Sequence, residues 1–530
     1  MIRLTSAPWA ALRRGGPLLL GALLPYSLLC GCGASAPARQ PDPALAAPPA
    51  LAHLQHPTFV FDDPATPVLP PDRARDWRDE VIYFVMPDRF FDGDPANNRD
   101  VDRTDKGKFH GGDWLGLQRK LGYLSQLGIT ALWITPVVRQ IDHPVTGAGF
   151  PDYPYHGYWA EDFTTVEPRL GTEAELRSLV QAAHGLGIKV LLDVVLNHPG
   201  YGSRFVQDGR MVRSTELGTC QESGDDLTNC LLGLPDFRTE DPTVAAQLIT
   251  WQLDWIARTG CDGFRVDTVK HVDHEVWREF RRRIHAAHPG FFLLGEVWGA
   301  LQHEEYASEF MGDQMDTLFD FGFNGEVEGF VLGRGRPVAF ARYLANRHKF
   351  PARLPLAHYL DSHDVPTFLH RLQGDTSKAV LAAVLQLTSL GIPVITWGNE
   401  VGRRGGEWPH NRSHMLWGEE QDQGLLSTYR KLVAIRKAHP ALSRGGFVSL
   451  HTGEHALVYL REAAEGEDRV LVALNRGEQD AAVELQLTGA AAAVPRWQEL
   501  FLDAGSVLAA TAGKLTLTIP AGGARILAAP

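Results

Sequence analysis

The chain has 530 residues, of which 44% are hydrophobic and 22% are charged, as in ordinary globular proteins that bury a large core. This composition excludes a fibre or an intrinsically disordered protein. The net charge of -12 excludes a protein that binds nucleic acid mainly through an excess of positive charge.

The N-terminal residues have the pattern of an export signal. A stretch with three arginines precedes an apolar run over residues 17–29, which is too short to span a bilayer comfortably. The run ends at Leu-Cys-Gly-Cys, which resembles the bacterial lipobox and predicts a lipid on Cys32, with simple secretion as the alternative. We therefore expect a signal peptide over residues 1–32 and an Ala- and Pro-rich tether over residues 33–71. The protein would be periplasmic, on the cell surface or secreted, and would touch a membrane only through this anchor.

The residues from 72 to 440 alternate strand-like apolar runs with amphipathic helices, which is typical of βα units around a parallel sheet. Eight strands predict an α/β fold with a (β/α)8 barrel over residues 72–440. The expected strands are Val81–Met86, Ala131–Thr135, Val190–Leu196, Gly263–Asp267, Phe291–Glu296, Thr317–Phe321, Ala357–Asp361 and Pro393–Trp397.

Capping signals mark several helix starts. Asp113 precedes a helix whose apolar residues recur at spacings of three and four until Gly128 ends it. Thr172 and Glu175 have the spacing of a capping box, and Asp241 stands before a proline at the first helical position.

Between residues 198 and 240 the periodic pattern fails, which predicts a loop-rich excursion after the third strand. Cys220 and Cys230 lie close enough there to form a local disulfide in an oxidising compartment. Cys261 stands in an apolar strand and is expected to be a buried thiol. Metal binding by the three cysteines is disfavoured because they lack a paired spacing with histidine.

The residues from 441 to 530 form short β-rich segments separated by Gly and Asp turns. Examples are Ala456–Leu460, Val470–Asn475 and Lys514–Ile519. We expect a separate antiparallel β-sandwich domain.

Charged residues stand at the carboxyl ends of several predicted strands, where active sites of this fold are built. Arg265 and Asp267 share one face of their strand because alternate residues point the same way. Taken alone they could be a structural ion pair. The placement recurs, however, at Asp193, Asn197, His198, Glu296, His363 and Asp364.

Such a cluster of carboxylates, an arginine and histidines suits glycoside cleavage, in which one carboxylate attacks and a protonated one assists the leaving oxygen. Arg265 would keep Asp267 ionised, while Glu296 in a more apolar setting would hold its proton.

The segments DVVLNH, GFRVDTVKH, GEVW and DSHD resemble, in this order, the four signature regions of the α-amylase family of glycoside hydrolases. The segments GITALWITP, YHGYWAEDF, LPDF and GIPVITWGNE are also similar, so the resemblance covers residues 81–440. It implies that Asp267 is the nucleophile, Glu296 the general acid/base and Asp364 a third carboxylate that grips sugar hydroxyls.

The resemblance also implies a set of sugar contacts. Arg265, His198 and His363 would touch the sugar or tune the carboxylates, and Tyr158 with His156 would stack under the sugar at the cleavage point. Lys270 matches a position on the leaving-group side. Trp298 would be a further stacking surface or, as the alternative, a structural residue.

Two structural calcium sites follow from the same resemblance. The first is similar to a site of cyclodextrin glycosyltransferases and would use Asp92, Asp94, Asn97, Asn98, the Gly111 carbonyl and Asp113. An ordinary turn rich in Gly, Asn and Asp is the alternative. The second would use Asn197, Asp236 and the His271 carbonyl to clamp the excursion onto the barrel.

The activity that the resemblance implies is retaining hydrolysis of internal α-1,4 bonds in starch, glycogen or maltooligosaccharides by a monomer. The runner-up is a transglycosylase, or an enzyme that degrades cyclodextrin or pullulan. Hydrolysis is expected because the chain leaves no room for the extra starch-binding domains that cyclodextrin-forming enzymes usually carry. A non-catalytic glucan-binding relative is disfavoured because Asp267, Glu296 and Asp364 are all present.

Three departures from the family pattern stand outside the catalytic carboxylates. Ser362 replaces an Asn, and Phe237-Arg238 replaces Leu-Asn. Residues 408–412 lack the acidic residues that often bind donor sugars, so the sequence predicts no particular chain-length preference.

Overall fold

The computed structural model describes residues 75–530, apart from residue 148 and residues 221–224, 299–307, 348–354 and 464–467. The expected signal peptide, tether and lipidated Cys32 lie outside the described residues. In the described part of the chain, no helix is both long and apolar enough to cross a membrane.

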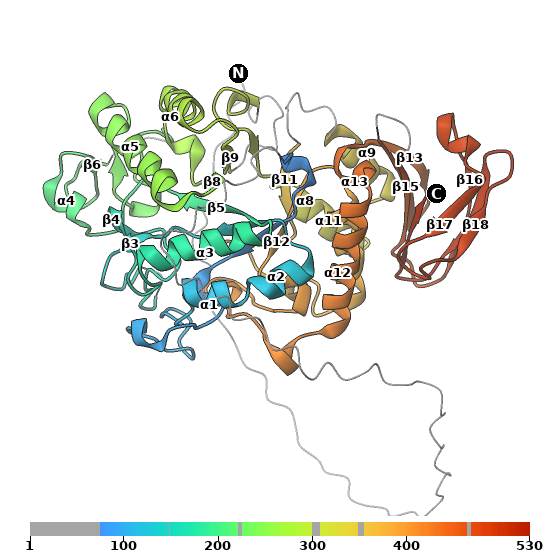
Figure 1. Ribbon diagram of the computed structural model, residues 1–530, viewed down its shortest axis with the longest axis horizontal. Coiled ribbons are helices and arrows are strands. Elements are labelled where there is room, and N and C mark those ends of the chain that lie inside the picture. Colours follow the sequence, from blue (N-terminus) through green and yellow to red (C-terminus); the bar gives the residue numbers. More distant parts are fainter. Residues whose placement is uncertain (1–74, 148, 221–224, 299–307, 348–354, 464–467) are drawn as a thin grey trace, which may run out of the picture. The chain divides into compact units, whose positions relative to one another are not determined.

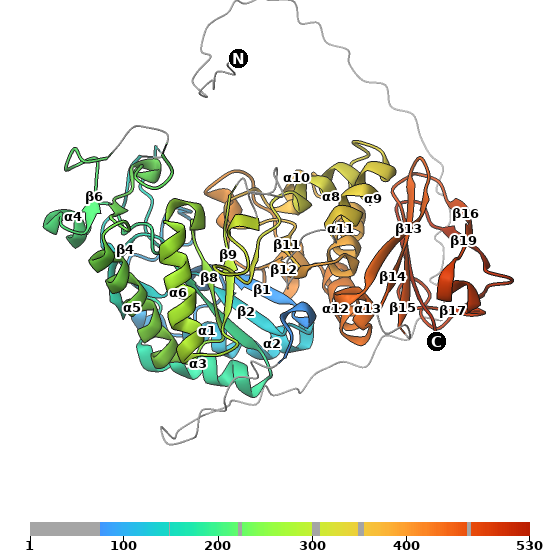
Figure 2. The ribbon, with the colours of Figure 1, turned by 90° about the horizontal axis from the view of Figure 1, so that it is seen from above.

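Eight parallel strands form the barrel that the sequence predicts (Figures 1 and 2). The sheet runs in the order β10-β9-β8-β5-β2-β1-β12-β11, and a parallel bridge between Phe319 and Ala357 brings its two edges together. Each strand is buried throughout, because a barrel wall is covered by helices outside and by side chains inside. The strands are β1 (Ile82–Val85), β2 (Ala131–Ile134), β5 (Lys189–Val194), β8 (Gly263–Val266), β9 (Phe292–Gly295), β10 (Thr317–Leu318), β11 (Ala357–Tyr359) and β12 (Ile392–Thr396).

Helices cover the outside of this barrel, and the predicted caps are present. Asp113 accepts from the Gly116 amide, and Thr172 and Glu175 form a reciprocal capping box. The helices are α1 (Trp114–Arg119), α2 (Leu121–Leu127), α3 (Glu173–Gly185), α5 (Pro242–Thr259), α6 (His274–Ala287), α8 (Phe323–Val331), α9 (Pro337–Asn346), α10 (Phe368–Arg371), α11 (Thr376–Thr388), α12 (Gln423–Ala438) and α13 (Pro440–Arg444).

The expected single helix after Asp113 is two helices. The backbone leaves the helical conformation at Lys120, whose amide is shared between the carbonyls of Gly116 and Leu117. At this break the Lys120 ammonium lies 4.0 Å from the centre of the Phe91 ring, a cation–π contact.

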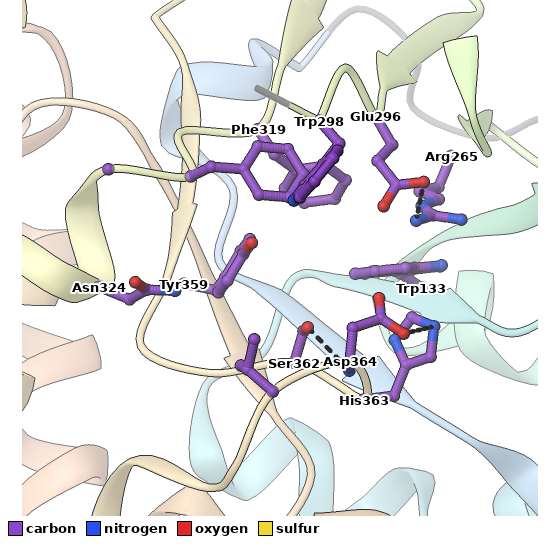
Figure 3. Close-up of a pocket in the computed structure, with 13 residues that line it drawn as sticks. Trp133, Arg265, Glu296, Trp298, Phe319, Asn324, Tyr359, Ser362, His363 and Asp364 are labelled. Atoms are coloured by element: carbon purple, nitrogen blue, oxygen red, sulfur yellow. Dashed lines mark hydrogen bonds and ion pairs between the residues drawn. The ribbon is translucent and has the colours of Figure 1, made fainter. Parts of the chain in front are cut away.

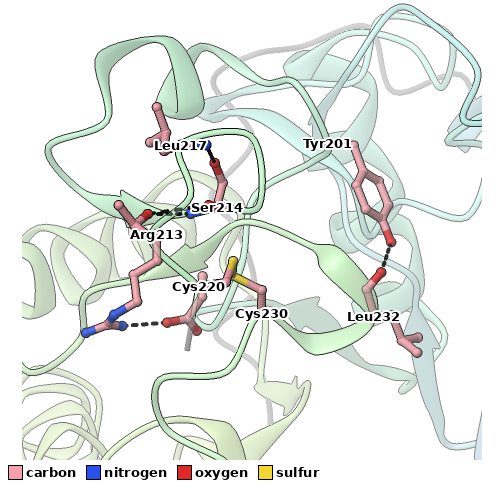
Figure 4. The surroundings of a disulfide bond; sticks show 9 residues. Tyr201, Arg213, Ser214, Leu217, Cys220, Cys230 and Leu232 are labelled. Carbon is pink, nitrogen blue, oxygen red and sulfur yellow. Dashed lines mark hydrogen bonds and ion pairs between the residues drawn. A yellow bond between two sulfur atoms is a disulfide. The ribbon is translucent and has the colours of Figure 1, made fainter. Parts of the chain in front are cut away.

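The excursion follows β5 and lies against a small hairpin, β3 (Val138–Gln140) and β4 (Ala160–Val166). It contains α4 (Arg204–Asp208) and the antiparallel pair β6 (Val212–Arg213) and β7 (Asp236–Phe237). Cys220 and Cys230 form a disulfide with their Cα atoms 5.6 Å apart (Figure 4). Cys261 is buried outside the disulfide, as expected.

The C-terminal domain is a β-sandwich, as predicted. Its larger sheet has the order β13-β14-β15-β20-β17-β18, and the pair β16 and β19 packs on it through a shared core around Trp497. The strands are β13 (Gly446–Thr452), β14 (Ala456–Glu462), β15 (Arg469–Asn475), β16 (Ala481–Gln486), β17 (Arg496–Glu499), β18 (Val507–Ala509), β19 (Lys514–Ile519) and β20 (Ala524–Ala528).

Candidate active site

A cavity of about 690 Å³ lies at the carboxyl ends of the barrel strands (Figure 3). In this view Glu296 and Asp364 turn their carboxyl groups toward the same space from opposite sides of the Trp133 ring. The lining consists of Trp133, Arg265, Glu296, Trp298, Phe319, Phe321, Gly322, Asn324, Tyr359, Ser362, His363, Asp364 and Val365. Charged groups thus share this cavity with several aromatic rings.

One buried guanidinium joins the carboxylates of three strands. Arg265 Nη1 donates to Asp267 Oδ1 at 2.6 Å and to Asp193 Oδ1 at 3.0 Å, while Nη2 lies 2.9 Å from Glu296 Oε2. Strand alternation brings Arg265 and Asp267 to the same face, and the parallel register of β5, β8 and β9 brings the other two carboxylates beside them.

The two carboxyl groups at the centre have opposite proton affinities. Burial acts to raise the pKa of Asp267, but the charges of Arg265 and His198 and the hydrogen bonds from Arg265 and Glu296 leave it below its usual value of 3.8. Burial and the nearby charges of Asp267 and Asp364 raise the pKa of Glu296 to about 8, against the opposing charge of Arg265. At neutral pH the site therefore holds one carboxylate and one protonated carboxylic acid.

Aromatic and imidazole rings flank these carboxyl groups. The Tyr158 hydroxyl donates to Asp193 Oδ2 at 2.8 Å, and its ring stacks on His363 at 5.2 Å with an interplanar angle of 5°. His156 Nδ1 accepts from the Tyr158 amide at 3.0 Å. Burial lowers the pKa of His156, His198 and His363, the last to about 4, so they are neutral at physiological pH.

Asp364 is the most open of the predicted catalytic residues, since 50% of its side chain is exposed. Arg412 Nη2 lies 3.4 Å from Asp364 Oδ1, and Arg412 Nε donates to the His363 carbonyl at 2.9 Å. The 408–412 segment thus supplies an arginine to the third carboxylate.

Lys270 and Trp298 lie together at the rim. Lys270 Nζ is 5.3 Å from the centre of the Trp298 ring and 3.5 Å from Asp226 Oδ2. The Trp298 side chain is 68% exposed. A large aromatic ring that faces solvent beside an acid is suited to stacking on a sugar.

The loop predicted to bind calcium contains three buried oxygens without a hydrogen-bond partner. They are Asp92 Oδ1, Asn97 Oδ1 and Asn98 Oδ1, and Asn98 Oδ1 lies against the backbone of Gly111. Buried polar atoms are normally paired, so these oxygens fit the donor set of a hard cation. In the part of the chain that the structure describes, no three His, Cys, Asp or Glu side chains gather as a metal site, so amide and carbonyl oxygens would have to contribute.

Asp113 and Asp94 have other partners in this loop. Both Asp113 oxygens accept backbone bonds, from Gly93, Asp94 and Gly116, and Asp94 caps the short turn that follows it. These two carboxylates order the loop around the unpaired oxygens.

The second predicted set also meets in space. One terminal atom of the Asn197 side-chain amide lies 3.3 Å from Asp236 Oδ1 and 3.0 Å from the His271 carbonyl oxygen. This atom is the oxygen in one orientation of the amide and the donating nitrogen in the other. Asp236 Oδ2 is already bound by Arg213 Nη1 at 2.6 Å. A cation here would share its single carboxylate with a guanidinium.

The family model for the α-amylase catalytic domain matches residues 84–216 and 226–416. The chain belongs to the α-amylase family of glycoside hydrolases. Neopullulanase 2 of Thermoactinomyces vulgaris is 34% identical over 432 residues, which are 76% of this chain and 71% of that protein. The cyclomaltodextrinase of Geobacillus thermopakistaniensis is 30% identical over 478 residues, 84% of this chain and 76% of the relative.

Solved structures of α-amylase-family proteins have the same architecture. An Anoxybacillus α-amylase matches with a TM-score of 0.75 and 31% identity, covering 86% of this chain and 99% of that one. The cyclomaltodextrin glucanotransferase CldA, described as having three domains, matches with a TM-score of 0.75 and 27% identity. The match covers 85% of this chain and 99% of that one. A cyclomaltodextrin glucanotransferase with three domains is thus known, so the missing extra domain does not by itself separate hydrolases from transferases.

Several cavity residues carry no signal in the sequence that marks them as functional. Three of them stand in or next to apolar strands, where the sequence pattern predicts core residues: Trp133, Phe319 and Tyr359. Asn324 lies in the first turn of α8, which carries no motif. Asp193 stood at a strand end in the sequence, and its three donors, Trp133, Tyr158 and Arg265, become visible only in three dimensions.

Proposed function

We propose that this chain is a retaining glycoside hydrolase of α-glucans in which Asp267 is the nucleophile and Glu296 the general acid/base. The observation that carries the proposal is that one guanidinium contacts both carboxyl groups: Arg265 Nη1 donates to Asp267 Oδ1 at 2.6 Å, and Nη2 lies 2.9 Å from Glu296 Oε2. Inverting enzymes keep their two carboxyl groups about 6.5–9.5 Å apart to admit a water, whereas retaining enzymes hold them closer. Two carboxyl groups that share one guanidinium lie close together, as the retaining mechanism requires.

In the first step, Glu296 gives its proton to the glycosidic oxygen while Asp267 attacks the anomeric carbon. The bond to the leaving sugar breaks, and a covalent glycosyl-enzyme forms on Asp267. In the second step the Glu296 carboxylate takes a proton from water, which displaces Asp267. Two inversions leave the product with the configuration of the substrate.

The surrounding groups prepare this chemistry. Arg265 keeps Asp267 ionised and is itself fixed by Asp193, so the nucleophile cannot turn away. Tyr158, anchored on Asp193, offers its ring to the sugar at the cleavage point. We assign to Asp364 and His363 the binding of sugar hydroxyls, with Arg412 orienting Asp364.

For the substrate we propose cyclodextrins, pullulan and maltooligosaccharides rather than long starch chains alone. The support is the group of similar relatives, which are named neopullulanase, cyclomaltodextrinase and maltogenic α-amylase. Internal α-1,4 cleavage, the first expectation from the sequence, is retained as one activity of the same site.

Transfer to a sugar acceptor is a second candidate, and one observation favours it. The exposed Trp298 ring beside Lys270 offers a stacking surface next to the acid/base. A sugar held there competes with water for the glycosyl-enzyme, so transfer products should grow with acceptor concentration.

We propose that calcium binds the loop with the unpaired oxygens of Asp92, Asn97 and Asn98, and that Gly111, Asp94 and Asp113 shape this loop. We propose a weaker calcium site at Asn197, Asp236 and the His271 carbonyl, because Arg213 offsets its single negative charge. The ion would hold loops in place and would not take part in the reaction.

Export is proposed on the support of the Cys220–Cys230 disulfide, because such bonds persist in oxidising compartments. A lipid on Cys32 is proposed as the anchor.

The experiment that tests the function compares the purified protein with its Glu296→Gln variant on γ-cyclodextrin, pullulan and amylose, and identifies the sugars released. We expect turnover of all three substrates by the wild type and a loss of at least a thousandfold in the variant, with binding of maltoheptaose intact. Unchanged turnover in the variant would refute the assignment of Glu296.

A further inference from the structure

The side chain of Asp364 is held less firmly than that of Asp267. Half of the Asp364 side chain is exposed, and its polar contacts are long, 3.4 Å from Oδ1 to Arg412 Nη2 and 3.5 Å to His363 Nε2. Asp267 Oδ1, by contrast, accepts from Arg265 Nη1 at 2.6 Å. The direction of the Asp364 carboxylate therefore depends on the backbone that carries it.

One buried amide binds the backbone on both sides of Asp364. The Asn411 side chain is fully buried, and its Nδ2 atom donates to the His363 carbonyl at 2.8 Å and to the Val365 carbonyl at 3.2 Å. Ser362 Oγ accepts from the Asp364 amide at 3.2 Å (Figure 3). Because β11 has already ended, side chains rather than strand pairing fix this turn.

Asn411 is held in turn by a second buried side chain. Arg403 donates from Nη1 to the Asn411 carbonyl at 2.6 Å and from Nε to the Trp397 carbonyl at 2.7 Å, directly after β12. Its guanidinium carbon lies 4.3 Å from the centre of the Trp397 ring. The amides of Thr367 and Gly405 add two further bonds between the two loops, both at 2.9 Å. Asn411 thus connects the Asp364 turn to a fixed part of the barrel.

We propose that Asn411 is a positioning residue, which orients the Asp364 carboxylate by fixing the two carbonyl groups that flank it. This inference rests on the proposed function, which assigns the binding of sugar hydroxyls to Asp364. Asn411 acts through the turn and not on the sugar, since its side chain is fully buried and its donor group is used by the backbone. A catalytic group displaced by about 1 Å can lose about a hundredfold in rate, so a rigid support behind it matters.

A purely structural role for Asn411 is the alternative, and Asn475 provides a matched control. Asn475 is buried in the C-terminal domain, where its Nδ2 atom likewise donates to backbone carbonyls, those of Gln479, Ile519 and Pro520. Asn411→Ala and Asn475→Ala remove the same kind of bond, so both should lower the unfolding midpoint. Only Asn411→Ala should affect the reaction.

The test is a double-mutant cycle between Asn411→Ala and Asp364→Ala, followed as kcat/KM for α-maltosyl fluoride well below the unfolding midpoints. The activated leaving group keeps the residual activity of Asp364→Ala measurable. In the wild-type background Asn411→Ala should lower kcat/KM roughly ten- to a hundredfold. In the Asp364→Ala background the loss should be less than about threefold, because the carboxylate to be positioned is gone. Asn475→Ala should change kcat/KM by less than about twofold in either background.

Equal losses from Asn411→Ala in the two backgrounds would overturn the proposal, as would a loss no larger than that from Asn475→Ala. Asn411→Ser should give an intermediate loss, because its hydroxyl can donate to only one of the two carbonyls. It takes the place of Asn411→Ala in the cycle if that variant does not fold.

Failure of the proposed function has a different outcome, which is no turnover by the wild type or full activity in Asp364→Ala. Asn411 is then tested without activity, by hydrogen exchange and mass spectrometry of a peptide that covers residues 360–367. Exchange should be at least about fivefold faster in Asn411→Ala than in the wild type and in Asn475→Ala, because the turn opens more often. Unchanged exchange would overturn the proposal on that measurement.

Discussion

The Arg213→Met substitution should loosen the excursion beside the active site. Arg213 is buried on β6 and binds two acidic residues, Asp236 on β7 at 2.6 Å and Glu240. Asp236 is buried, whereas 54% of the Glu240 side chain is exposed. Methionine fills a similar volume but leaves the Asp236 carboxylate in the interior without its cation.

The expected cost comes almost wholly from Asp236. Removing one partner of a buried ion pair typically costs about 3–5 kcal/mol, while an exposed pair contributes about 0–1 kcal/mol. Arg213→Met should therefore lower the unfolding midpoint by roughly 5 °C, and the control Glu240→Gln by no more than about 1–2 °C. Thermal unfolding followed by fluorescence measures both.

The loss should also depend on pH and on calcium. Burial already raises the pKa of Asp236 to about 7 although Arg213 acts to lower it, so without Arg213 the folded state must bind a proton there. The free energy of unfolding of the variant then falls as pH rises above about 4, where the Asp236 carboxyl of the unfolded chain ionises. The difference in unfolding midpoint between the wild type and Arg213→Met should therefore be small at pH 4 and full at pH 8. Millimolar calcium should reduce this difference in unfolding midpoint if the ion takes the place of the guanidinium beside Asp236. An Arg213→Met midpoint equal to that of Glu240→Gln at pH 8 without calcium would refute this reasoning.

Three further predictions concern acid–base chemistry, metal and disulfide. The value of kcat/KM should fall above about pH 8, where Glu296 loses its proton. On the acid side it should fall only below about pH 4, where Asp267 becomes protonated. A loss of activity that begins near pH 5 on the basic side would contradict the assignment of the proton to Glu296. A chelator should lower the unfolding midpoint of the wild type, because a ligand at 100 times its Kd contributes about 2.7 kcal/mol, and Asn98→Ala should respond much less; equal responses would argue against this loop. Cys220→Ser opens a ring with a sequence separation of 10, so the excursion should lose about 2–3 kcal/mol and be cleaved faster by a protease, whereas an unchanged cleavage rate would contradict that role.

The fold was largely predictable from local patterns. Each of the eight expected strand segments contains or overlaps one barrel strand, because buried parallel strands are continuous apolar runs flanked by helices. The capping box at Thr172 and Glu175 was equally readable. The break at Lys120 was not, since the apolar spacing of three and four residues continues through it.

The site was predictable where charge interrupts an apolar run. Arg265 and Asp267 stand out in their strand for this reason, but their partner Asp193 gains its role from a register between strands 72 residues apart. Trp133 lines the cavity from within an apolar strand, where its sequence context does not distinguish it from a core residue. Trp408 replaces an expected acidic residue, and its packing on Phe150 requires the folded loops.

Trapping of the glycosyl-enzyme tests the central claim most directly. Glu296→Gln, incubated with a fluorinated glucosyl fluoride that reacts without acid assistance, should accumulate a covalent sugar, and peptide mass spectrometry should locate it on Asp267. A labelled peptide that carries another carboxylate, or no covalent adduct together with products of inverted configuration from the wild type, would contradict the retaining mechanism proposed for this site.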